Sequence, residues 1–168
     1  MEPWTNVALT GAGATLAMDA WTLARARLFG VASLDYRLVG RWLAWMPRCR
    51  FRHRPITASA PMPGERAIGW TAHYLIGIAF ASALLAIAGS GWFQQPAIGP
   101  ALAVGIASIA APFFVMQPAL GYGIAASRTA NPTAARLRSL ATHTVFGLGL
   151  WAAGWAITGS SALFSRVS

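Results

Sequence analysis

Residues Ala67–Phe93 read AIGWTAHYLIGIAFASALLAIAGSGWF, a long apolar run with a single histidine, His73, near its start. A membrane-spanning helix needs about 20 mostly apolar residues, and this stretch predicts such a helix. The pattern recurs 70 residues later, where the chain from Ala141 reads ATHTVFGLGLWAAGWAITGSSALF. In this alignment 7 of the 18 positions from residue 73 onward are identical, and His73 meets His143. An apolar segment does not need a histidine, so the match indicates an internal repeat.

The composition is that of a membrane protein. Of the 168 residues, 56% are hydrophobic and 10% are charged, whereas about a quarter of the residues of a soluble domain are charged. Four apolar segments are long enough to cross a bilayer, with predicted bounds of residues 5–24, 67–88, 100–123 and 139–159. We therefore expect residues 1–168 to form one all-α integral membrane domain, a bundle of four transmembrane helices, with no separate soluble domain.

The two halves of the chain share one plan. Each half has a span, a basic loop, and a returning span that carries a histidine. This plan predicts two parallel helix hairpins, related by a pseudo-two-fold axis along the membrane normal. Gly77 and Gly147, which also align, lie one turn beyond the two histidines. Because small residues let helices approach closely, we expect backbone contacts at both glycines.

The charges predict an orientation. All 13 basic residues are arginines, and the formal net charge is +9. Nine lie in the loop of residues 25–66 and three in the loop of residues 125–138, whereas the opposite side has Arg166 against Glu2. Basic loops tend to stay in the cytoplasm, so both loops are predicted there and both termini outside. Because the excess lies between apolar spans, it favours membrane orientation over nucleic-acid binding.

The first basic loop contains two distinct patterns. Asp35–Met46 (DYRLVGRWLAWM) has the spacing of a short amphipathic helix lying in the membrane interface, and Pro47 would end it. Its predicted apolar face holds Leu38, Trp42, Trp45 and Met46, with Arg37 and Arg41 away from that face. Arg48–Pro55 (RCRFRHRP) follows, and it is read either as a patch for anionic lipid head groups or as a solvated topology signal. The patch arginines are Arg48, Arg50, Arg52 and Arg54. Cys49, the single cysteine, excludes an intramolecular disulfide.

Each predicted span carries one polar group at a similar depth. These groups are Asp19, His73, Gln117 and His143. At 1.5 Å per residue their distances from the cytoplasmic ends agree within a helical turn. Ionisable residues inside a membrane usually face the bundle and have partners. The sequence therefore predicts that the four side chains converge in the inner-leaflet half of the bundle.

The polar layer permits several chemistries. A hydrogen-bonded cluster would pin the helices together, with Asp19 accepting from a histidine. Two histidines and a carboxylate, here Asp19, His73 and His143, are also a recognised ligand set for iron or zinc. The two histidines could hold a haem, and a proton or solute path through the bundle is a further reading. No ligand pair has a short diagnostic spacing, and no particular cofactor follows from the residues.

The third span contains two prolines, Pro112 and Pro118. Each removes a backbone donor, so the carbonyls of Ser108 and Phe114 are expected to lose their helical partners. We expect the prolines to kink the span and to turn Gln117 inward.

Several blocks of the chain resemble those of a known family. They are Gly13–Trp21, Val39–Trp42, Pro63–Arg66, His73–Gly77, Gln117–Gly121 and Thr142–Gly147. The family that they resemble is domain-of-unknown-function family 2938, a set of small bacterial inner-membrane proteins. The resemblance implies a bacterial inner membrane and hence periplasmic termini, but it brings no activity, cofactor or catalytic residue.

These features predict a small multi-pass inner-membrane protein that is a structural or interaction component, in contact with the bilayer and its anionic head groups. A membrane-protein partner or a second copy of the chain would be its other contact. The alternatives are a metal- or haem-binding membrane protein or enzyme that uses the Asp/His cluster, and a small oligomeric transporter. No nucleophile–base pair, phosphate loop or thiolate pair favours other chemistry.

Overall fold

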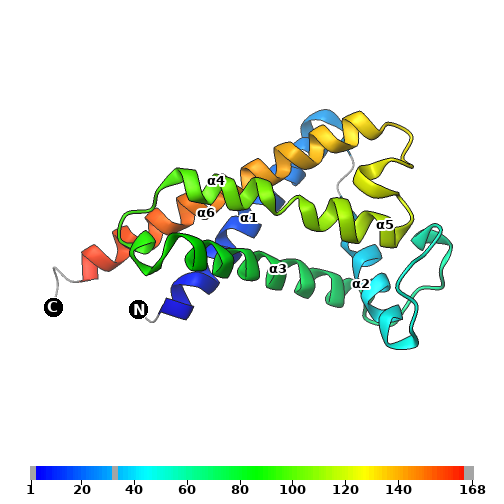
Figure 1. The fold of residues 1–168 in the computed structure, drawn as a ribbon, viewed down its shortest axis with the longest axis horizontal. Helices are drawn as coiled ribbons and strands as arrows, with labels where there is room; N and C mark the ends of the chain where they lie inside the picture. Colours follow the sequence, from blue (N-terminus) through cyan, green and yellow to red (C-terminus); the bar gives the residue numbers. More distant parts are fainter. Residues whose placement is uncertain (1–2, 32–33, 165–168) are drawn as a thin grey trace. The chain divides into compact units, whose positions relative to one another are not determined.

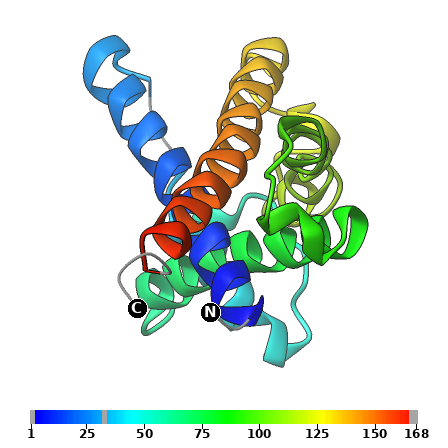
Figure 2. The same cartoon turned by 90° about the vertical axis from the view of Figure 1, so that its left-hand side faces the viewer.

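The computed structural model describes residues 3–31 and 34–164, and every regular element within them is helical. Figure 1 shows the chain, and Figure 2 shows it turned by 90°. Short 3-10 turns and one π-helical segment, Ala111–Met116, lie between the longer helices. The prediction of an all-α fold is therefore confirmed. The α-helices are α1 (Pro3–Phe29), α2 (Tyr36–Trp45), α3 (Glu65–Ala88), α4 (Ile98–Ala107), α5 (Gln117–Leu120) and α6 (Pro132–Phe164).

The chain divides into two compact units, which we describe separately. The apolar unit contains Met1–Val31, Tyr74–Ala107 and Thr142–Ser168. The basic unit contains Ala32–His73 and Ser108–Ala141. Ten of the 13 arginines belong to the basic unit, together with only two carboxylates. Most of the arginines therefore belong to the basic unit, and most of the apolar sequence belongs to the other unit.

Three helical stretches in the described part of the chain are long and apolar enough to cross a membrane. They are Glu65–Ala88, Ile98–Leu120 and Pro132–Gly159. Helix α1, which contains the predicted first span, is not among them, because its glycines, threonines and Asp19 lower its mean hydropathy. The structure therefore supports a membrane protein, and the count of four spans stays a prediction.

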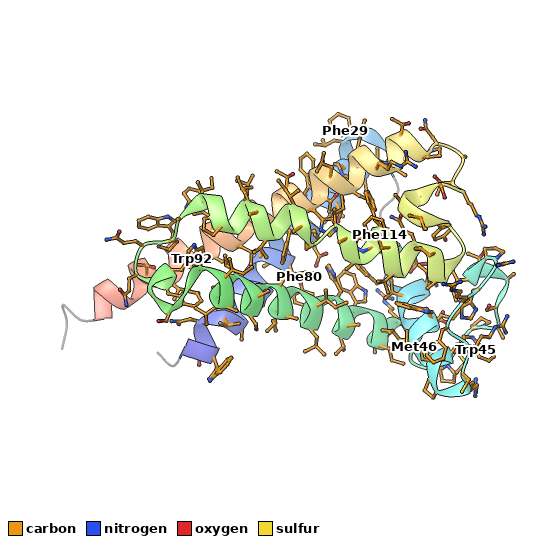
Figure 3. All side chains as sticks on the ribbon, viewed as in Figure 1. Phe29, Trp45, Met46, Phe80, Trp92 and Phe114 are labelled. Atoms are coloured by element: carbon orange, nitrogen blue, oxygen red, sulfur yellow. The ribbon has the colours of Figure 1, made fainter. Side chains whose placement is uncertain are left out.

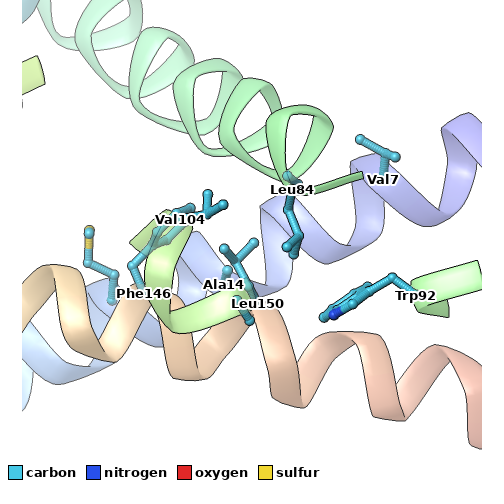
Figure 4. Packing of buried hydrophobic residues seen from close by; sticks show 10 residues of the cluster. Val7, Ala14, Leu84, Trp92, Val104, Phe146 and Leu150 are labelled. Atoms are coloured by element: carbon cyan, nitrogen blue, oxygen red, sulfur yellow. The ribbon is translucent and has the colours of Figure 1, made fainter. Parts of the chain in front are cut away.

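The apolar unit has one hydrophobic core, formed by segments of α1, α3, α4 and α6. Phe80 of α3 (Figure 3) meets Phe146 of α6 (Figure 4) edge to face, with ring centroids 6.4 Å apart. Leu84 and Leu150 are 1% and 0% exposed at the centre of this core (Figure 4). Trp92, in the turn between α3 and α4, closes one end and donates its indole N–H to Ala97 O at 3.0 Å.

Glycines bring the helices of the apolar unit into backbone contact. A Cβ on Gly77 would overlap Thr15 Oγ1 of α1, and a Cβ on Gly147 would lie 3.0 Å from Ala101 O of α4. The predicted close contacts at these two glycines are thus present, while the two-fold axis of the repeat stays a prediction. A third contact joins α6 to α1, where a Cβ on Gly149 would lie 2.9 Å from Ala14 Cα.

Two helices are longer than the sequence analysis predicted. Helix α1 runs five residues past the predicted end, to Phe29, and Gly30 with φ of +64° follows it as a left-handed cap. Helix α6 begins at Pro132 instead of residue 139, because Asn131 caps it by accepting from the Ala134 N–H at 3.0 Å. Proline at the first helical position is a common start signal. The predicted loop of residues 125–138 is therefore partly helical, and Arg136 and Arg138 lie on α6.

The third apolar stretch is interrupted, as the two prolines predicted. Helix α4 ends at Ala107, and the π-helical segment and α5 follow. Pro112 has no N–H to give the Ser108 carbonyl its usual helical partner, as expected, and Ser108 O accepts instead from the Ala111 N–H at 3.1 Å in a tight turn. Gly121, with φ of +94°, ends α5 by donating its N–H to the carbonyls of Gln117 and Pro118.

In the basic unit, α2 packs on the first turns of α3. Asp35 caps α2 by accepting from the Arg37 N–H, and Met46–Arg48 continues as a 3-10 turn that contains Pro47. The predicted short helix is confirmed, and it packs on α3 through residues outside its predicted apolar face, whose place in the membrane interface stays a prediction. Val39 and Gly40 are buried, and a Cβ on Gly40 would overlap Glu65 O. Small size at Gly40 decides which face of α2 meets α3.

Candidate functional site

The arginine segment Arg48–Pro55 is fixed in place at His53. The backbone N–H of His53 donates to Ala119 O of α5 at 2.8 Å. The side chain of His53 is 2% exposed, and the nearby Ile56 is 0% exposed. Gly121 allows this approach, because a Cβ there would lie 2.8 Å from His53 O. The segment is thus an ordered part of the basic unit, although its arginines are exposed.

The imidazole of His53 has one partner. Its Nδ1 lies 2.7 Å from Ser59 Oγ, and its buried Nε2 has no hydrogen-bond partner among the described residues. Burial lowers the pKa of His53, because it penalises the charged form, and the nearby Arg50 guanidinium lowers it further. We therefore treat His53 as a neutral group at pH 7.

The four patch arginines divide into two pairs. The guanidiniums of Arg48 and Arg50 lie over the Trp45 ring, 5.0 Å and 5.2 Å from its centroid. Arg52 and Arg54, further along the segment, line a cavity. Two arginines therefore stack on an aromatic ring of α2, and two remain for a ligand.

The basic cavity, as we call it, has a volume of about 290 Å³. The turn Gly123–Arg128 provides its opposite wall, with Ser127 and Arg128. No carboxylate lines this cavity, and among the described residues the side chains of its three arginines form no hydrogen bond or ion pair. Guanidinium groups and a hydroxyl are suited to binding an anion, above all a phosphate. Its polar lining residues are Arg52, His53, Arg54, Ser127 and Arg128.

An apolar groove of about 350 Å³ lies next to the basic cavity. Phe114 is 63% exposed and Val115 is 58% exposed, and both belong to the π-helical segment (Figure 3). Arg52 and Pro118 line both hollows, so the groove and the cavity are adjacent. The apolar groove is lined by Trp42, Met46, Phe51, Phe114, Val115 and Ala119, besides the two shared residues.

Comparison with known proteins gives one match. The profile of the family described as protein of unknown function (DUF2938) matches residues 8–157, which is most of the chain. The chain belongs to this family. No curated protein and no solved structure matches it.

Two of the sequence blocks that resemble the DUF2938 family meet in the basic unit. Arg41 Nε and Nη2 donate to the two carboxylate oxygens of Glu65 at 2.8 Å and 2.9 Å. Arg41 Nη1 also donates to Ser59 O at 3.0 Å. The two side chains are 12% and 13% exposed. Arg41, which was expected to lie away from the apolar face of α2, thus ties α2 to α3 and to Ser59, the residue that contacts His53.

The predicted polar layer of this DUF2938 chain is divided between the units. Asp19 and His143 belong to the apolar unit, and His73 and Gln117 belong to the basic unit. Asp19 Oδ2 accepts from the Tyr74 hydroxyl at 3.1 Å, a partner that the sequence analysis did not name. The convergence of the four side chains stays a prediction.

His73 lies in an aromatic cluster of the basic unit. Its ring stacks on Tyr36 of α2, with centroids 4.1 Å apart, and Trp70 meets it edge to face at 6.0 Å. Within residues 3–31 and 34–164, no group of three His, Cys, Asp or Glu side chains is close enough to hold a metal ion. The predicted ligand set of Asp19, His73 and His143 gains no support from this structure.

Two features of the basic unit were not predicted from the sequence: the second wall of the basic cavity and the Arg41–Glu65 pair. Both join residues from different parts of the chain, Arg128 with Arg52 and Arg41 with Glu65. One signal was present, because a chain with 13 arginines and four acidic residues is expected to pair its few carboxylates. Nothing in the local sequence indicates which arginine is the partner.

Proposed function

We propose that this chain is a non-enzymatic component of the bacterial inner membrane whose basic unit is held against the anionic head groups of the cytoplasmic leaflet. The observation that carries the proposal is the separation of charge. Ten arginines against two carboxylates leave the basic unit with an excess of eight positive charges. Both carboxylates, Asp35 and Glu65, are already paired within the unit.

The energetics favour such an anchor. Each basic residue near an anionic leaflet contributes about 1 kcal/mol of attraction. Interfacial tryptophans add to it, since their rings settle at head-group level. Trp42 and Trp45 of α2 lie beside the arginine segment, and their indole N–H groups donate to Phe51 O and Ala60 O. Helix α2 and the arginine segment would thus form one interfacial surface.

The apolar unit would meet lipid tails, a second copy or another membrane protein. Several of its large apolar side chains are exposed, including Leu75 at 59% and Ile87 at 73%. Such residues are suited to a hydrocarbon environment. The interaction role of the chain would then combine this apolar surface with the basic anchor.

The experiment compares the full-length chain in nanodiscs of phosphatidylcholine with discs that also contain phosphatidylglycerol. Tryptophan fluorescence follows thermal unfolding. We expect anionic lipid to raise the unfolding midpoint at low salt, and the rise to shrink at high salt because exposed charges are screened. Replacing Arg48, Arg50, Arg52 and Arg54 by Gln should remove most of the rise. Equal midpoints of the native chain in both kinds of disc would contradict the proposal.

A further inference from the structure

The adjacency of the basic cavity and the apolar groove is the starting point. One hollow is lined by three arginines and the other by aromatic and aliphatic side chains, and Arg52 and Pro118 belong to both. A ligand that fills both must be anionic at one end and apolar at the other.

We propose that the basic cavity and the apolar groove together bind one anionic glycerophospholipid, with its phosphate among Arg52, Arg54 and Arg128 and an acyl chain along Phe114 and Val115. This inference rests on the proposed function and deepens it. The basic unit would bind one lipid at a saturable site, in addition to its general attraction to anionic head groups.

The positive charge and the hydrogen-bond donors of the basic cavity favour a phosphate group there. Arg52 and Arg54 come from the first basic loop and Arg128 from the second, so only the folded unit brings the three together. Arginine forks bind phosphate oxygens through paired, charge-assisted hydrogen bonds. Ser127 adds a hydroxyl to the lining. A cavity of about 290 Å³ lies at the lower end of the range for ligand pockets, which suits a head group.

The exposed apolar side chains of the groove favour an acyl chain there. Phe51, Phe114 and Val115 are 56%, 63% and 58% exposed, yet they lie beside an arginine-lined cavity. In water such a surface would be unfavourable, because apolar area gains free energy by leaving water. An acyl chain in the groove would cover it. A free phosphate would occupy the cavity and leave the groove exposed, so the two ligand sources can be distinguished.

The patch arginines that stack on Trp45 provide a matched control. Arg50 lies in the same segment as Arg52 and carries the same charge, but its guanidinium lies over the Trp45 ring. Arg66, at the start of α3, is an exposed arginine that does not line the cavity. Neither guanidinium lines the cavity, so neutralising either removes one charge from the basic unit and leaves the three proposed phosphate ligands in place.

The test is native mass spectrometry of the detergent-released full chain, titrated with phosphatidylglycerol, with phosphatidylcholine, and with inorganic phosphate as competitor. We expect one tight phosphatidylglycerol adduct. Arg128→Gln and Arg52→Gln should each weaken it about tenfold, the loss that corresponds to one hydrogen bond between charged groups. Arg50→Gln and Arg66→Gln should change it less than about twofold. Phe114→Ala should weaken lipid binding and leave competition by inorganic phosphate unchanged.

Other outcomes separate the two proposals. Equal, small losses in all four arginine variants would overturn the single site and leave the anchoring function standing. Inorganic phosphate that binds as tightly as the lipid, with no effect of Phe114→Ala, would overturn the lipid assignment in favour of a free phosphate ester. Phosphatidylglycerol binding no tighter than phosphatidylcholine, together with equal unfolding midpoints in the two kinds of nanodisc, would overturn both. Arg52 and Arg128 are exposed, so unfolding midpoints near the native value will show that these variants fold.

Discussion

At the scale of single residues, His53 should make the stability of the folded chain depend on pH. Burial and Arg50 lower its pKa in the folded chain, whereas an unfolded histidine titrates near about 6.5. Between the folded and the unfolded pKa, the unfolded chain binds more protons, so stability rises with pH. The stability that depends on a neutral His53 is therefore present above about pH 6.5 and is lost as the pH falls toward the folded pKa.

We accordingly expect the unfolding midpoint of the native chain to fall as the pH is lowered from about 7.5 to about 5.5. His53→Gln removes the titrating group and should flatten this dependence, while lowering the midpoint at pH 7 because the contact with Ser59 is altered. The difference between variant and native chain isolates His53 from the other two histidines. Parallel curves for both proteins would show that His53 does not titrate in this window.

At the scale of helices, packing depends on glycines at crossing points. A Cβ on Gly105 of α4 would lie 2.6 Å from the backbone nitrogen of Gly147 on α6, closer than atoms can approach. Gly105→Ala should therefore force the two helices apart, at a cost of about 1–3 kcal/mol. Thermal unfolding in detergent will measure the loss as a lower midpoint. Gly99→Ala, on the same helix with no atom within 4 Å of the added Cβ, should leave stability unchanged or slightly raised. A similar loss in both variants would argue against contact packing as the cause.

The helices were the most predictable part of this chain, because apolar runs and end signals are local. Helix α3 ends at Ala88 as its composition predicts, and α2 lies where the apolar spacing of residues 35–46 places it. The predicted end of α1 and the predicted start of α6 were wrong, although the sequence holds a signal for each. Gly30 marks the end of α1, and Asn131-Pro132 marks the start of α6. The packing of α2 on α3 was not predicted, because an amphipathic pattern marks the apolar face and gives no sign of a close backbone approach such as that at Gly40.

Only the first-loop half of the candidate site was predicted from the sequence. The first-loop arginines were identified because they are consecutive in sequence, but their division into a pair on Trp45 and a pair on the cavity is set by folded geometry. Arg128 and the π-helical segment reach the site through contacts between distant segments, such as that of His53 with Ala119. Local sequence does not carry this information.

At the scale of the whole molecule, the distribution of charge predicts the orientation of the chain in the membrane. The turn between α3 and α4 carries no charge over residues 89–99, whereas the basic unit carries most of the arginines. From the positive-inside rule we predict that the arginine segment lies in the cytoplasm and that turn in the periplasm. Both the anchoring role and the lipid site depend on this orientation, because anionic lipid attracts basic segments at the cytoplasmic leaflet.

The chain contains its own probe of orientation. Cys49, the single cysteine, is exposed within the arginine segment. A membrane-impermeant maleimide should label Cys49 in inside-out vesicles and leave it unlabelled in intact spheroplasts. In a Cys49→Ser background, Gln95→Cys should give the opposite result, with labelling in spheroplasts. Labelling of Cys49 from outside, or of both positions from the same side, would contradict the account.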